Sequence, residues 1–226
     1  MSGEGRPEVP FSAIKATLKK AVGALNARGV PFMLGGGLAV WARGGPDTDH
    51  DLDLMVKPED AERALEVLAA EGMRVERPPE HWLVKAYDDD VLIDLIYEPS
   101  GLEIDDGVFE RAQQLDVYAL RILVLPLEDV LVTKLLAMGE HQLDYEAVLE
   151  IARALREQID WPDVRERTAT SPYARAFFTL IEALDVIEPP SGTVRSVSVI
   201  GDARVEPAAD AGPSEHPVRR TRSGRR

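Results

Sequence analysis

The chain has 226 residues, contains no cysteine and carries a formal net charge of −14. The lack of cysteine excludes disulfide frameworks, zinc–thiolate sites and cysteine nucleophiles, and it suits a reducing compartment such as the cytoplasm. The acidic balance argues against duplex DNA as a partner, because the body of the chain repels phosphate backbones.

The N-terminal stretch MSGEGRPEVP has neither the basic start nor the apolar run of a signal peptide, so we expect a cytoplasmic protein with a flexible segment over residues 1–10. The most apolar stretch, VYALRILVLPLEDVLV, is interrupted by Arg121, Pro126, Glu128 and Asp129. It therefore does not qualify as a membrane span, and we expect no membrane partner.

The first half of the chain alternates between helical and strand patterns. Apolar residues at helical spacing predict a helix over residues 11–28, which Gly29 ends. Short apolar runs bounded by Gly, Pro or Asp predict strands. In chain order the next expected elements are a strand in PFML, a helix in GGLAVWARG, a strand in HDLDLMV, a helix in AERALEVLAAEG, and strands in MRVERP, HWLVKAY and VLIDLIY.

The second half is mostly helical. A strand in LRILVLP precedes helices in PLEDVLVTKLLAM, DYEAVLEIARALREQI, WPDVRERTA and SPYARAFFTLIEALDVI. Residues 189–226 are rich in Pro, Gly, Ser and Ala and hold seven arginines against four acids, so we expect a largely disordered tail, with one strand in VRSVSVI. The pattern predicts an α+β fold, with a mixed sheet flanked by helices in a core over 11–125 and a helical C-terminal subdomain over 126–188.

Three aspartates lie in predicted strands, where charge is costly. Asp51 and Asp53 alternate with leucines and so point the same way, and Asp94 lies within an even more apolar strand. If the two strands are neighbours, the carboxylates converge, and each pair about 5 Å apart repels by roughly 3 kcal/mol at an effective dielectric constant near 20. Two Mg²⁺ ions, which prefer oxygen ligands, would offset this charge and suit phosphoryl or nucleotidyl transfer.

A structural alternative exists for these acids. Asp51 and Asp53 would then lie on a solvated strand end, and Asp94 would pair with a lysine. The glycines upstream favour a functional site, because Gly36 and Gly37 stand between a strand and a helix, where bare backbone N–H groups can hold phosphate oxygens. In such a site Asp53 or Asp94 could also take the proton of an attacking hydroxyl.

The glycine pair, short helix, Asp-x-Asp strand and later strand aspartate resemble the nucleotidyltransferase superfamily that includes DNA polymerase beta. GGLAVWARG…T..DLDLMV is most similar to the small bacterial branch of AbiEii-type toxins. The resemblance covers residues 33–56 well and extends to about residue 97. It implies that Gly36, Gly37 and Thr48 contact the nucleotide and that Asp51, Asp53 and Asp94 bind magnesium and carry catalysis.

Several residues outside this motif are candidates as well. In the family, Thr-x-Asp-x-Asp is usual, whereas Asp49 and His50 separate Thr48 from Asp51 here, so either residue could have a separate role. The toxin relatives carry a lysine on a later helix, which implies that Lys134 binds the triphosphate, although a snorkelling lysine is the alternative. Asp144 follows as a candidate whose alternative is helix capping. Finally, Arg43 and Lys85 are candidate phosphate contacts.

The resemblance implies a Mg²⁺-dependent enzyme of the nucleotidyltransferase class (EC 2.7.7 type). It would transfer a nucleoside monophosphate from an NTP to a tRNA or other RNA end, a protein or a small molecule, and release pyrophosphate. As a toxin it would have a small antitoxin protein as partner. The alternatives are a non-catalytic nucleotidyltransferase-fold module and an aminoglycoside or lincosamide adenylyltransferase.

Overall fold

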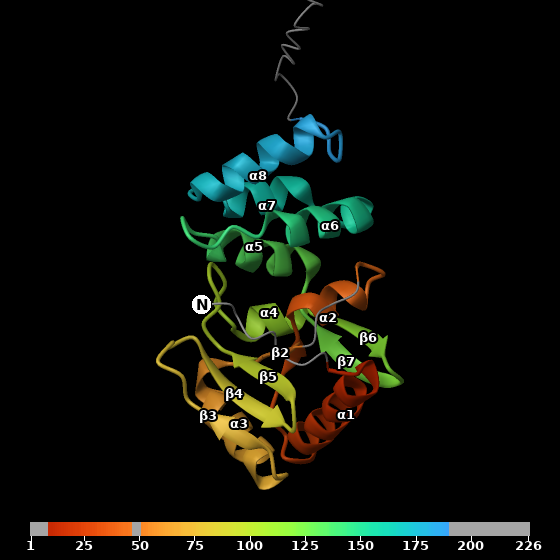
Figure 1. Cartoon of the computed structure of the whole chain (residues 1–226), viewed down its shortest axis with the longest axis vertical. Helices are drawn as coiled ribbons and strands as arrows, with labels where there is room; N and C mark the ends of the chain where they lie inside the picture. The colour runs from red at the N-terminus through yellow and green to blue at the C-terminus, as the bar shows by residue number, and fades with distance from the viewer. Residues whose placement is uncertain (1–8, 47–50, 190–226) are drawn as a thin grey trace, which may run out of the picture. The chain divides into compact units, whose positions relative to one another are not determined.

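The computed structural model describes residues 9–46 and 51–189 and confirms the predicted α+β architecture, a mixed sheet flanked by helices. The strands of the described part form one seven-stranded sheet in the order β3-β4-β5-β2-β1-β7-β6 (Figure 1). Their bounds are β1 Met33–Leu34, β2 Asp51–Met55, β3 Arg74–Glu76, β4 Leu83–Asp88, β5 Val91–Ile96, β6 Gln113–Val117 and β7 Leu120–Val124.

Strand β2 occupies the centre of this sheet. It pairs antiparallel with β1 and parallel with β5, while β1 pairs parallel with β7. On one side β3, β4 and β5 form an antiparallel meander, and on the other β6 and β7 form a hairpin. The two strands that carry the predicted acids are therefore direct neighbours.

The helices pack in two groups, which Figure 1 separates along its vertical axis. Helices α1 and α3 contact each other and strands of the sheet, whereas α2 contacts β2 and α5. Helix α5 also contacts α6, α7 and α8, so it joins the C-terminal helices to the rest. The bounds are α1 Phe11–Ala27, α2 Gly36–Trp41, η1 Pro58–Asp60, α3 Ala61–Ala70, α4 Asp106–Arg111, α5 Leu127–Ala137, α6 Tyr145–Leu155, η2 Arg156–Gln158, α7 Trp161–Arg167 and α8 Pro172–Ala183.

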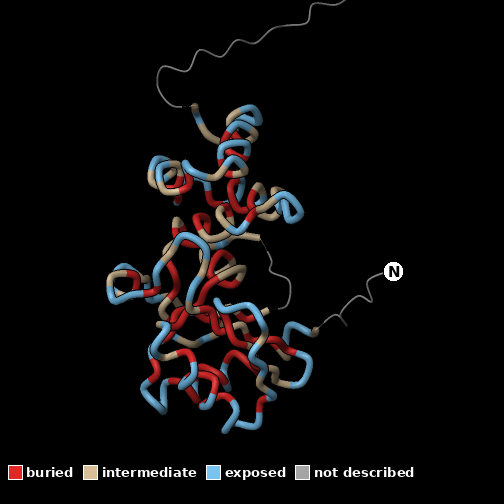
Figure 2. The backbone as a smooth tube through the Cα atoms, turned by 90° about the vertical axis from the view of Figure 1, so that its left-hand side faces the viewer, coloured by how far each residue is buried: buried red, intermediate tan, exposed pale blue. Residues whose placement is uncertain are grey.

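The hydrophobic core explains why the acids face where they do. Leu52 and Leu54 of β2 are fully buried, and the alternation of side chains then turns Asp51 and Asp53 to the opposite face. Strand β5 is buried on both faces except at Asp94. Buried backbone runs through the sheet and the inner sides of the helices (Figure 2). Asp94 is thus a polar position inside an otherwise apolar strand.

Helix α4 and strand β6 have no counterpart among the sequence predictions, whereas β7 matches the strand predicted in LRILVLP. Helix α4 is short, and the β6–β7 hairpin turns at Tyr118 and Ala119, both with positive φ (50° and 64°). Such turns are normally marked by Asn or Gly, which adopt positive φ at low cost. Because neither residue occurs here, the sequence pattern contains no turn signal.

Some predictions fall on residues that the structure does not describe. Thr48, Asp49 and His50 lie outside the described residues, as do the strand predicted in VRSVSVI and the rest of 190–226. The division of the chain at residue 126 stays a prediction. Within the described part, no helix is both long enough and apolar enough to cross a membrane.

Candidate active site

Strands β2 and β5 bring two of the predicted acids face to face. In their parallel register Asp53 lies directly opposite Asp94, and Leu52 lies opposite Ile93. Asp51, two residues before Asp53, shares its face of β2 and contributes to its electrostatic environment. The structure thus places the three aspartates in one region of the sheet.

The carboxyl group of Asp53 has an unusual protonation behaviour. Removal from solvent, and next the negative charge of Asp94, raises the pKa of Asp53 to about 7. The charge of Lys134 acts in the opposite direction, and smaller effects come from Asp51 and Lys85. Near neutral pH, Asp53 therefore exchanges its proton readily.

The glycine run touches this carboxyl group. Gly36 begins α2 with φ +53°, and a Cβ atom added there would lie 1.6 Å from Asp53 Oδ2. The backbone N–H of Gly35 donates a hydrogen bond of 2.8 Å to the Asp53 carbonyl. Only glycine permits both the positive φ and this close approach, so the run fixes the position of Asp53.

Two lysines supply positive charge on this side of the sheet. Lys85 of β4 lies opposite Asp94, and its Nζ donates a hydrogen bond of 2.8 Å to Asp94 Oδ1. The structural alternative, in which Asp94 pairs with a lysine, therefore describes Asp94 correctly. Lys134 of α5 lines the same cavities as Asp53, and its charge lowers the pKa of that carboxyl group. The lysine on the later helix is thus part of the site.

Two cavities meet at Asp53 and Lys134. The first, which we call the polar cavity, has a volume of about 350 Å³, and the second, the apolar cavity, about 250 Å³. Residues lining the polar cavity include Gly37, Asp51, Asp53, Lys134, Asp144 and Glu150. Residues lining the apolar cavity include Asp53, Met55, Trp82, Ile96, Val130 and Lys134. Asp53 and Lys134 line both cavities. A ligand in either cavity would therefore lie next to these two side chains.

The remaining candidates have separate positions. Asp144 caps α6 by accepting a hydrogen bond of 3.1 Å from the N–H of Ala147, as the capping alternative predicts, and it also lines the polar cavity. Arg43 donates to the carbonyls of Ala39 (2.8 Å) and Leu125 (2.9 Å). Arg43 thus connects α2 to Leu125, the residue after β7, and it does not line either cavity.

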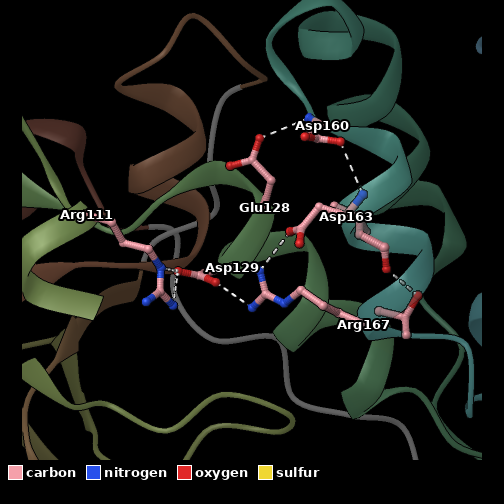
Figure 3. Close-up of polar contacts among 8 residues, drawn as sticks. Arg111, Glu128, Asp129, Asp160, Asp163 and Arg167 are labelled. Carbon is pink, nitrogen blue, oxygen red and sulfur yellow. Dashed lines mark hydrogen bonds and ion pairs between the residues drawn. The ribbon is translucent and has the colours of Figure 1, made fainter. Parts of the chain in front are cut away.

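A buried ion-pair network holds α5, the helix that carries Lys134. Asp129 is fully buried and accepts hydrogen bonds from Arg111 Nε (3.1 Å) and Arg167 Nη2 (2.5 Å) (Figure 3). Arg167 also donates to Asp163 at 3.0 Å. Arg111 belongs to α4 and Arg167 to α7. The network therefore connects α5 to both of these helices.

Magnesium binding depends on how these acids are arranged. Within residues 9–46 and 51–189, no three Asp, Glu, His or Cys side chains form a ready metal site. The donors nevertheless suit the ion, because a divalent cation would relieve the repulsion that raises the pKa of Asp53, and carboxylate oxygens are the ligands it prefers. Asp51, Asp53 and Asp94 supply carboxylate oxygens of this kind without forming a preassembled site.

Sequence reasoning did not identify several residues of the site. Trp82, Glu98 and Thr133 line the apolar cavity, and Glu150 lines the polar one. Trp82 is 43% exposed although it is a large aromatic residue. It directly precedes β4, and its exposure follows from the fold, so the sequence carries no signal for it.

Comparisons with known proteins agree with this architecture. The antibiotic-resistance factor ANT(2″)-Ia in solution is 17% identical over 78% of this chain and 98% of its own, with a TM-score of 0.55. A lincomycin-bound lincosamide antibiotic adenylyltransferase is 13% identical (67% and 99% covered, TM-score 0.47), and a tRNA-processing enzyme 16% identical (80% and 50%, TM-score 0.38). The first likeness shows the nucleotidyltransferase fold, and the other two TM-scores support no conclusion.

Sequence comparisons define the family more directly. No curated protein matches the chain significantly. The sequence model of a family described as uncharacterised nucleotidyltransferase matches residues 12–185. This range includes the glycine run, all three aspartates and Lys134. The closer resemblance to AbiEii-type toxins gains no support from these comparisons. The chain belongs to the family of uncharacterised nucleotidyltransferases.

Proposed function

We propose that this protein is a Mg²⁺-dependent enzyme that transfers a nucleoside monophosphate from an NTP to an acceptor hydroxyl and releases pyrophosphate. The observation that carries the proposal is the pairing of Asp53 with Asp94 across β2 and β5, with Lys134 beside Asp53. Acids in this arrangement repel one another, and a divalent cation bound with an NTP would offset their charge.

Each side chain has a distinct function in this proposal. Asp51, Asp53 and Asp94 would hold the metal, which when bound would supply positive charge to offset that of the phosphates. Gly36 and Gly37 let phosphates approach the backbone, and Lys134 offsets the negative charge of the triphosphate. Thr48 is a further phosphate contact that we propose from the family resemblance.

The chain also supplies a proton acceptor. The attacking hydroxyl must lose its proton as its bond to the α-phosphorus forms. A carboxyl group with a pKa of about 7, as at Asp53, accepts and releases a proton near neutral pH. Metal ligation and proton transfer are alternative roles for Asp53, and the same holds for Asp94, the second carboxylate on that face.

The identity of the acceptor molecule determines which kind of nucleotidyltransferase the protein is. An RNA end, a protein or an antibiotic would each define a different enzyme within the same chemistry. The toxin form would act in the cytoplasm and be held inactive by a small antitoxin protein. The acidic chain favours an acceptor without a long phosphate backbone, since like charges repel.

Labelled nucleotides test this function. The purified protein is incubated with Mg²⁺, each α-³²P-labelled NTP, total bacterial RNA and a panel of aminoglycosides and lincosamides, with Asp53→Asn alongside. We expect label in one acceptor class with the parent protein, and none with the variant or with EDTA. Absence of both transfer and Mg²⁺-dependent NTP binding would support a non-catalytic module instead.

A further inference from the structure

The apolar cavity differs from the polar cavity in the chemistry of its walls. Besides Asp53 and Lys134, which it shares, its lining includes Met55, Ile96 and Val130. Among the described residues that line it, Lys134 is the only cation, and Glu98 adds a negative charge. Such walls suit an apolar body.

The walls of the apolar cavity are fixed in place. The Trp82 carbonyl accepts hydrogen bonds from the N–H groups of Tyr97 (3.0 Å) and Glu98 (3.2 Å), which hold the residue beside the end of β5. On the other side, Gly101 packs so tightly on α5 that an added Cβ would lie 2.0 Å from Leu136 Cδ1. The segment between these points, with Pro99 and Ser100, forms a defined wall.

We propose that the apolar cavity binds the acceptor, and that the acceptor is a small neutral or cationic molecule with an apolar body and a hydroxyl group. This inference rests on the proposed function. The phosphates occupy the polar cavity, where Gly37 and Asp51 lie, and the acceptor enters from the other side of Asp53 and Lys134. Its apolar ring packs on Trp82, whose exposed face has no other partner of comparable size in the cavity wall.

The reaction then links the acceptor in the apolar cavity to the α-phosphate of the NTP in the polar cavity. The acceptor oxygen forms a bond to the α-phosphorus, and the bond from that phosphorus to the α–β bridging oxygen breaks. Pyrophosphate leaves with the electron pair of that bond, and the hydroxyl proton passes to water. A volume of about 250 Å³ is slightly below the usual range for drug-sized ligands, roughly 300–1,000 Å³, which fits a molecule of one or two rings.

Filling the cavity tests this inference. Ala137 is the exposed last residue of α5 and lines the apolar cavity, so Ala137→Trp would occupy it. Ala70 is the exposed last residue of α3 and lies away from both cavities, so Ala70→Trp is the matched control. The acceptors are 2-phenylethanol and tyrosol as ring-bearing alcohols, tobramycin as a polar polyhydroxylated compound, and total tRNA.

We expect transfer of α-³²P label to the ring-bearing alcohols, and a loss of about tenfold or more in kcat/KM for Ala137→Trp but not for Ala70→Trp. Binding of the non-hydrolysable α,β-methylene-ATP with Mg²⁺, measured by calorimetry, should be unchanged in both. Trp82→Ala provides a second variant, expected to raise KM for these alcohols with little change in kcat.

The other outcomes overturn the inference in distinguishable ways. Transfer only to tRNA or tobramycin, or transfer to the alcohols that Ala137→Trp leaves intact, would refute the apolar acceptor cavity and leave the proposed function standing. Nucleotide binding without transfer to any of these acceptors would also refute the apolar acceptor cavity and leave the proposed function standing. A parent protein that binds no nucleotide would remove the proposed function itself, and the acceptor cavity with it.

Discussion

Asp53 is subject to opposing influences that set its charge at neutral pH. Loss of solvent and the charge of Asp94 favour the protonated form, while Lys134 favours the ionised form. The net result is a pKa far above that of an ordinary aspartate. Metal binding would reverse this balance, because an added cation stabilises the ionised carboxylate.

This pKa makes stability depend on pH in a direction opposite to that of most aspartates. The folded pKa of about 7 lies above the ordinary 3.8, so the folded state binds the extra proton between these values. The stabilisation is fully present below about pH 4 and is lost as pH rises through 7. Asp53→Asn cannot titrate, so from pH 5 to 8 the parent should lose on the order of 1–4 kcal/mol relative to the variant in metal-free buffer.

Urea unfolding of both proteins at several pH values checks this prediction. Parent and variant curves that stay parallel across the range would show that Asp53 has an ordinary pKa. Adding Mg²⁺ at pH 8 should raise the stability of the parent more than that of Asp53→Asn, because only the parent keeps the full set of acids.

Gly36 gives a second prediction at the scale of a single residue. Gly36→Ala combines a positive-φ penalty of roughly 1–2 kcal/mol with a direct clash against Asp53 Oδ2. Gly29 has a similar φ of +62° and open space around it, so Gly29→Ala carries the φ penalty alone. We expect both variants to lose stability but only Gly36→Ala to lose activity, by about 100-fold or more. If the two variants were equally active, the exact position of Asp53 would not matter for catalysis.

At the scale of elements, Asp129 connects α4, α5 and α7. Its two arginine partners are partly exposed, while the carboxylate itself has no contact with solvent. Breaking a buried ion pair is costly because a charged group loses its partner in a medium of low polarity. The position of Lys134, five residues further along α5, therefore depends on this network.

Asp129→Asn should lower the free energy of unfolding by about 3 kcal/mol. Glu157→Gln, the same chemical change in the exposed pair with Arg156, serves as the control and should leave stability unchanged. Thermal and urea unfolding measure both. An Asp129 variant as stable as the control would mean that the network does not hold α5.

The elements also show where sequence reasoning succeeds and where it fails. Strand β2 could be predicted because Leu52 and Leu54 alternate with the acids, and α2 because glycine precedes an apolar helix. The β6–β7 hairpin could not, since Tyr118 and Ala119 adopt positive φ without the usual residues. The pairing of Lys85 with Asp94 depends on the register of β4 and β5, which the short turn between these two strands sets.

At the scale of the whole molecule, the site lies where sheet and helices meet. The sheet contributes Asp53, α5 contributes Lys134, and α6 contributes the far wall of the polar cavity through Asp144 and Glu150. The three-aspartate motif could be predicted from the sequence, but the two cavities on either side of Asp53 could not. Their walls come from segments up to about a hundred residues apart, so only the tertiary fold brings them together.

The position of the label in the product tests the central claim most directly. Parallel reactions contain the protein, Mg²⁺, the acceptor mixture and the same NTP labelled with ³²P at either the α- or the γ-phosphate. Nucleotidyl transfer predicts that only α-label enters the acceptor and that γ-label appears in pyrophosphate. If γ-label entered the acceptor and α-label stayed in a nucleoside diphosphate, the protein would be a phosphotransferase, and the assignment of Asp53, Asp94 and Lys134 to nucleotidyl transfer would be wrong.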